Sequence, residues 1–118
     1  MNSFAQIKTE AIGDMIAVTI NANRVMDPVL IGDLGQELQT LFDSQPGKTF
    51  LLDLHNIEFL SSAVLNRLIV LDKSVKSAGG TMAFYKPSTA VSEVFSITKL
   101  DLLFQIYEDR AAAIAALG

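Results

Sequence analysis

Residues 48–68 read KTFLLDLHNIEFLSSAVLNRL, and this stretch indicates the fold of the whole chain. Its first part, Lys48 to Leu54, is almost continuously apolar, which is typical of a central strand buried on both faces of a parallel sheet. From Ser62 to Ala78 the apolar residues instead recur at helical spacing, at Val64, Leu68, Leu71 and Val75. A buried strand that leads through a short loop into an amphipathic helix predicts an α/β fold.

A helix is also predicted upstream of this stretch. Asp27 offers an N-cap, Pro28 suits the first helical position, and apolar residues follow at helical spacing at Leu30, Ile31, Leu34, Leu38, Leu41 and Phe42. Gly32 and Gly35 lie inside this helix, and each weakens it by up to about 1 kcal/mol relative to alanine. We therefore expect packing against the rest of the chain to supply most of its stability.

The remaining segments complete an alternation of strands and helices. Two β-prone runs, 4–12 and 15–20, flank Gly13-Asp14, a two-residue hairpin turn of the Gly-X form. After the helix that Gly79-Gly80 ends, we expect a strand at 81–85, a helix after Pro87-Ser88, a strand at 104–107 and an alanine-rich terminal helix. The order β-β-α-β-α-β-α-β-α predicts one domain, 1–118, with a mixed, largely parallel sheet layered with about four α-helices.

Composition limits the possible functions. The net charge of −4 comes without a Lys/Arg cluster, so we expect no nucleic-acid partner. The chain has no cysteine and one histidine, His55, so we expect neither a metal site nor a cofactor. No segment approaches the roughly 20 apolar residues of a membrane span, and residues 1–5 do not resemble a signal peptide. We therefore expect a cytoplasmic protein without membrane insertion.

The serine pair Ser61-Ser62 is the feature that suggests a function. It lies at the predicted strand-to-helix edge, where α/β sheets meet ligands and partners. Either serine can be the N-cap of the following helix, which is a purely structural role. The same position also tolerates a phosphate, because free N–H groups and the helix dipole stabilise negative charge there. We do not expect an enzyme, because no G-x-S-x-G motif surrounds the pair and His55 is the only available imidazole base.

The chain resembles a STAS domain, in particular the stand-alone anti-sigma factor antagonists. The family has a strand and loop leading to a pattern similar to F-h-D-S-S/T-G-L, where h is hydrophobic, and "LLDLHNIEFLSSAVLNRL" lies over it. Ser62 falls on the phosphoacceptor, Ser61 on the aspartate, Ala63 on the second hydroxyl residue and Val64 on the glycine. The segments "VTINANRVMD" (18–27) and "KPSTAVSEVFSITKLDLLFQIY" (86–107) also resemble the family, so the similarity covers essentially the whole chain.

The resemblance implies a regulator without enzymatic activity that switches between partners. Its partner would be an anti-sigma factor with serine-kinase activity that phosphorylates Ser62, with Ser61 as the alternative acceptor, and a serine phosphatase would reset it. We expect the partner-binding residues at the same edge: Asp27, Asp53, Phe59, Leu60, Ser61, Ala63, Val64 and Asn66.

Two other functions stay open. The serine and valine at the motif's aspartate and glycine positions favour an unphosphorylated STAS scaffold, or an accessory subunit of a larger signalling or lipid-transport assembly. In that case the serines only cap the helix. A binding site for a small molecule or lipid head group at the same helix N-terminus is the third hypothesis.

Overall fold

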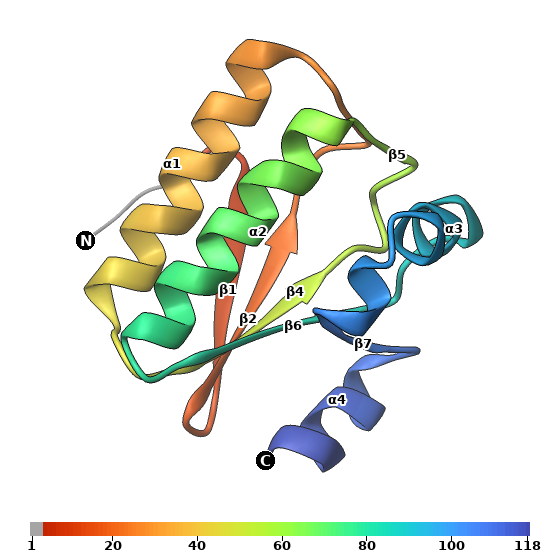
Figure 1. Ribbon diagram of the computed structural model, residues 1–118. Coiled ribbons are helices and arrows are strands. Elements are labelled where there is room, and N and C mark those ends of the chain that lie inside the picture. The colour runs from red at the N-terminus through yellow and green to blue at the C-terminus, as the bar shows by residue number, and fades with distance from the viewer. Residues whose placement is uncertain (1–3) are drawn as a thin grey trace.

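The computed structural model describes residues 4–118 and contains a five-stranded sheet with helices on both of its faces (Figure 1). The strand order is β1-β2-β4-β6-β7; β1 pairs antiparallel with β2, and the other neighbours pair in parallel. The elements are β1 (Ile7–Ile12), β2 (Met15–Ile20), β3 (Arg24–Val25), α1 (Pro28–Ser44), β4 (Thr49–Asp53), β5 (Phe59–Leu60), α2 (Ser62–Ser77), β6 (Thr81–Tyr85), α3 (Thr89–Ile97), a 3₁₀ turn (Leu100–Leu102), β7 (Gln105–Tyr107) and α4 (Arg110–Leu117).

The local signals in the sequence correctly predict the turns and helix ends. Gly13 takes a left-handed φ of 58° in the β1–β2 hairpin, and Gly79 takes a φ of 84° after α2, where a side chain would be strained. Asp27 is the N-cap of α1, and its carboxylate accepts a hydrogen bond from the Val29 backbone N–H. The expected mixed α/β architecture is confirmed, although the first three residues of the predicted 1–118 domain lie outside the described part of the chain.

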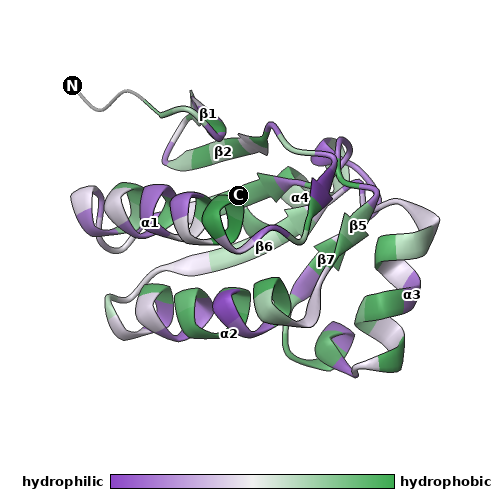
Figure 2. Cartoon of the chain, turned by 90° about the horizontal axis from the view of Figure 1, so that it is seen from above, coloured by the Kyte–Doolittle hydropathy of each residue, from purple (hydrophilic) through white to green (hydrophobic). Residues whose placement is uncertain are grey.

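The helices cover the two faces of the sheet unequally. One face carries Phe50, Leu52 and Phe84, which pack in the main core with the buried sides of α1, α2 and α3. Alternate residues of the same strands, Leu51 and Ala83 among them, point to the opposite face, where α4 covers them. β4 is therefore buried on both faces, as the sequence predicts. Figure 2 shows the mixed purple and green colouring of α1 and α2 that is typical of amphipathic helices.

Two short strands were not predicted, and they organise the edge that carries the serine pair. β3 and β5 form a separate two-stranded parallel sheet in which Arg24 lies opposite Phe59 and Val25 opposite Leu60. Each strand has only two residues, so it produces no periodic signal in the sequence. Among residues 4–118 no helix has both the length and the apolar character needed to cross a bilayer.

Candidate functional site

The starts of α1 and α2 are held together at the carboxyl-terminal edge of the main sheet. The backbone N–H of Glu58 donates to the Asn23 carbonyl at 2.6 Å, and that of Ser61 donates to the Val25 carbonyl at 3.1 Å. These bonds fasten the segment before α2 to the segment before α1. The two helices then run side by side over the same sheet face (Figure 1). Asp27 and Ser61 are 34 residues apart in the sequence. Both nevertheless lie at helix starts on the same edge of the sheet.

The structure separates the roles that the sequence leaves open for the two serines. Ser61 is the N-cap of α2, and its hydroxyl oxygen accepts the Val64 backbone N–H at 3.4 Å. Ser62 is the first residue of the helix, is exposed, and has no side-chain hydrogen bond to any residue in 4–118. The cap therefore does not require Ser62. Its hydroxyl is free to react at a helix N-terminus that favours an added negative charge.

Exposed apolar side chains surround this edge. Phe59 directly precedes Leu60 and the serine pair and is 38% exposed, while Met26 beside Asp27 is 50% exposed. The Arg24 guanidinium carbon lies 5.2 Å from the centroid of the Phe59 ring, a cation–π geometry that holds the ring in place. Val29 on α1 and Val70 on α2 add further exposed apolar surface. Met26 and Val70 line one groove together, and contiguous exposed apolar surface is typical of protein-protein contact sites.

Several residues that are expected to bind a partner are exposed or half-exposed at this edge. Phe59, Ala63 and Asn66 are exposed, Ser61 is half-buried at the cap, and Asp27 is exposed at the start of α1. Asn66 is one helical turn after Ser62, so the two residues lie on the same side of α2.

Leu60 and Val64 do not belong to that surface. Their side chains are 4% and 2% exposed and pack in the main core, so they cannot contact a docked partner directly. Their burial argues against direct side-chain contact, and a role of these two residues in partner binding stays an untested prediction. For Val64 the burial has a further consequence, because valine at the motif's glycine position adds no bulk to the surface.

Asp53 lies on the opposite face of the sheet from the serine pair. It alternates with Leu52, is 7% exposed, and its carboxylate is 2.7 Å from Nδ1 of His55. Burial and the nearby Asp53 charge raise the pKa of the Tyr85 phenol, which neighbours Asp53 across the β4–β6 pair. Asp53 thus forms a polar cluster with His55 and Tyr85 on the α4 face of the sheet, and its expected partner-binding role stays an untested prediction.

Sequence reasoning missed four residues at the edge: Arg24, Met26, Val29 and Val70. The sequence weakly indicates that the three apolar residues are exposed. Met26 and Val29 flank the helix start Asp27-Pro28, and Val70 lies outside the apolar stripe of α2. Arg24 has no local signal, since its contact with Phe59 depends on the pairing of β3 with β5.

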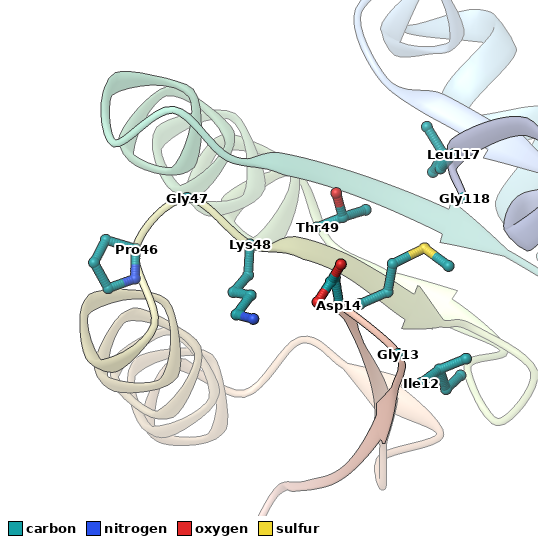
Figure 3. Close-up of a pocket in the computed structure, with 10 residues that line it drawn as sticks. Ile12, Gly13, Asp14, Pro46, Gly47, Lys48, Thr49, Leu117 and Gly118 are labelled. Carbon is teal, nitrogen blue, oxygen red and sulfur yellow. The ribbon is translucent and has the colours of Figure 1, made fainter.

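A hollow lies at the opposite end of the sheet from the serine pair. It is bounded by the β1–β2 turn, the loop before β4 and the end of α4, and Figure 3 shows Asp14, Lys48 and Thr49 around it. Because β2 and β4 begin here, this hollow is at the amino-terminal edge, away from Ser62. It shares no residue with the edge that carries the serine pair.

The comparisons with known proteins agree with this architecture. The pattern of the STAS domain matches residues 6–113, nearly the full length of the chain. The chain belongs to the STAS domain family. A STAS-domain protein of Planctomyces limnophilus, described as an anti-sigma-factor antagonist, superposes with a TM-score of 0.84 at 19% identity, covering 95% of this chain and 97% of that one. The Bacillus cell fate determinant SpoIIAA in its phosphorylated form superposes with a TM-score of 0.67 at 13% identity, covering 95% and 99% of the two chains.

Sequence similarity to individual named proteins covers less of the chain. A candidate anti-sigma factor antagonist of Thermotoga neapolitana is 38% identical over 64 residues, which cover 54% of this chain and 57% of that protein. The match thus spans little more than half the length of either protein. The structural similarities lie below 25% identity and establish the STAS fold of this chain.

Proposed function

We propose that this STAS domain is an anti-sigma factor antagonist that binds an anti-sigma factor through the edge around Ser62. The observation that carries the proposal is the position of Ser62: its hydroxyl is exposed and unbonded at the start of α2, beside the exposed Phe59 and Met26. The similarity to candidate and described anti-sigma factor antagonists supports it. The chain acts by binding, without catalysis of its own.

We further propose that phosphorylation of Ser62 by a serine kinase, with the anti-sigma factor as the candidate kinase, ends this binding, and that a serine phosphatase restores it. A phosphate adds a charge of about −1.5 to −2, which the N-terminus of α2 tolerates, so the fold survives. The exposed carboxylates of Asp27 and Glu58 precede the two helices at this edge. A partner docked there would have to desolvate the phosphate close to them.

The switch has a definite energetic requirement. Changing a complex from 99% bound to 1% bound requires about 5.5 kcal/mol of differential affinity. A phosphate that is buried by a partner can supply this amount, whereas a phosphate outside the contact area cannot. The proposal therefore requires Ser62 to lie within the interface.

The experiment begins with the full chain, a candidate anti-sigma kinase and ATP, followed by intact mass measurement and fragment mapping. One added phosphate on Ser62 is expected, and none on the Ser62→Ala variant. Ser88→Ala removes a serine from another helix start and serves as the control, and it should still receive the phosphate on Ser62. Phosphate on Ser61 instead would transfer the proposal to the capping serine and predict a loss of helix stability on modification.

The second step measures binding. Ser62→Asp is expected to melt like the wild type and to bind the anti-sigma factor at least tenfold more weakly, whereas Ser62→Ala binds normally. A stable complex in which Ser62 is never phosphorylated would instead support the scaffold or accessory-subunit function. The burial of Val64 removes one argument for that alternative, because valine does not obstruct the surface.

A further inference from the structure

An open groove separates the first halves of α1 and α2 on their outer side. Met26, Ile31 and Val70 supply its apolar lining, and Gln36 and Asn66 supply polar groups. Gly32 of α1 also lines the groove, and a Cβ at this position would meet no atom within 4 Å. The groove is therefore open partly because position 32 has no side chain.

Arg67 places a positive charge in this groove without a partner. Its Nε is buried and has no hydrogen-bond acceptor, and the guanidinium takes part in no ion pair with any residue in 4–118. Its side chain is fixed by contact with Gly35 of α1, where a Cβ would overlap with it. The Nε is enclosed by the chain's own atoms, whereas the two Nη nitrogens are not buried and have no hydrogen bond to any residue in 4–118, so the guanidinium can pair with an outside acceptor.

The charge of the groove identifies that acceptor. Its lining includes the Arg67 guanidinium and no carboxylate, although the chain as a whole has a net charge of −4. A guanidinium binds a carboxylate through a pair of charge-assisted hydrogen bonds, and the apolar residues on both sides of it match the apolar face of a helix. The surface is thus complementary to a helix that carries one acidic residue within an apolar stripe.

We propose that the groove binds an amphipathic helix of a protein partner, with a Glu or Asp of that helix paired to Arg67 and its apolar residues packed on Met26, Ile31 and Val70. The proposed function enters here at one point: it identifies the anti-sigma factor as the protein that carries this helix. The groove is continuous with the Ser62 edge, because Met26 and Ala63 belong to both.

The position of Arg67 also connects the groove to Ser62. The two residues are five positions apart on α2, which is about 7.5 Å along the helix axis. Five positions also turn the helix by about 140°, so the two side chains leave α2 in different directions. A partner that covers both would bring a phosphate on Ser62 into the same contact area as Arg67.

The test uses a phage-displayed library of helical peptides, selected on the unmodified full-length chain. One enriched peptide with an acidic residue, and its Glu→Gln counterpart, are then titrated by fluorescence anisotropy. The Glu→Gln change is expected to weaken binding to the wild type about tenfold and to leave binding to Arg67→Gln unchanged. Lys73→Gln is the matched control for charge, because Lys73 is exposed on α2 outside the groove, and it should retain the tenfold difference.

A second variant separates binding from folding. Gly32→Leu fills the open space of the groove and should abolish peptide binding while the urea midpoint stays at or above that of the wild type. Enrichment of no helical peptide, of peptides without a shared acidic position, or of peptides that still bind Gly32→Leu overturns the proposal. The titration needs neither kinase nor ATP, so a failure of Ser62 phosphorylation leaves its result intact. If Ser62 is phosphorylated but Arg67→Gln does not change the affinity for the acidic peptide, the groove proposal is refuted and the proposed function stands.

Discussion

The Arg67 side chain of α2 lies against the backbone of Gly35 in α1, so closely that a Cβ at position 35 would overlap with Nε of the guanidinium. The glycine therefore has a packing role that outweighs its unfavourable effect on the helix. Gly32, three residues earlier in the same helix, has open space where a Cβ would be. The two glycines lie in the same helix and look alike in the sequence. They differ in their surroundings, because α2 places the Arg67 side chain against Gly35 and nothing against Gly32.

This difference gives the first prediction. Gly32→Ala should stabilise the chain by up to about 1 kcal/mol through helix propensity. Gly35→Ala should destabilise it by about 1 to 2 kcal/mol, because Arg67 has to leave its packed position. Urea denaturation measures both, and the double variant Gly35→Ala/Arg67→Ala should recover most of the loss. Equal effects of the two alanine substitutions would show that the Arg67 contact does not constrain position 35.

The second prediction concerns the adjacent serines. Ser61→Ala removes the acceptor of the Val64 N–H bond and should lower the free energy of unfolding by about 0.5 to 1 kcal/mol. Ser62→Ala replaces an exposed, unbonded hydroxyl at the first helical position and should change it by less than about 0.5 kcal/mol. Thermal or urea unfolding of the two variants compares them directly. The reverse order of effects would assign the cap to Ser62.

Phe59 and Leu60 give the third prediction, because neighbours in one short strand face opposite environments. Leu60→Ala should cost about 2 to 4 kcal/mol of stability, since the side chain is 4% exposed and packs in the core. Phe59→Ala should cost about 1 kcal/mol or less and weaken anti-sigma factor binding at least tenfold. Unfolding curves and a binding titration check the pair. Normal binding by Phe59→Ala would place the partner surface elsewhere.

The fourth prediction is an alkaline loss of stability. Burial and the Asp53 charge raise the pKa of Tyr85 above its ordinary value of 10.0. The folded state therefore keeps its proton at pH values where the unfolded state loses it, and the free energy of unfolding falls as the pH rises above about 10. Stability measured against pH should show this fall in the wild type, and Tyr85→Phe should reduce it. Absorbance titration of Tyr107→Phe, in which Tyr85 is the remaining tyrosine, should show ionisation above pH 10.

Much of the architecture was predictable because its signals are local. The apolar run at Lys48 to Leu54, the Asp27-Pro28 start and the glycines after helices and in the hairpin depend on backbone preferences and burial periodicity. The position of Ser62 at a helix start was likewise predictable. The choice between Ser61 and Ser62 as the cap was not predictable, because both residues are serines and only the course of the backbone distinguishes them.

The sequence by itself determined the order of strands and helices, the likeness to the STAS family and the place of the serine pair at a strand-to-helix edge. Only the tertiary structure decided which residues at that edge reach the surface. Leu60 and Val64 turn into the core, Asp53 faces α4, and Phe59 stays outside under Arg24. The physical reason is that exposure and pairing depend on contacts between segments far apart in the chain, such as β3 with β5 and Gly35 with Arg67, which local periodicity does not encode.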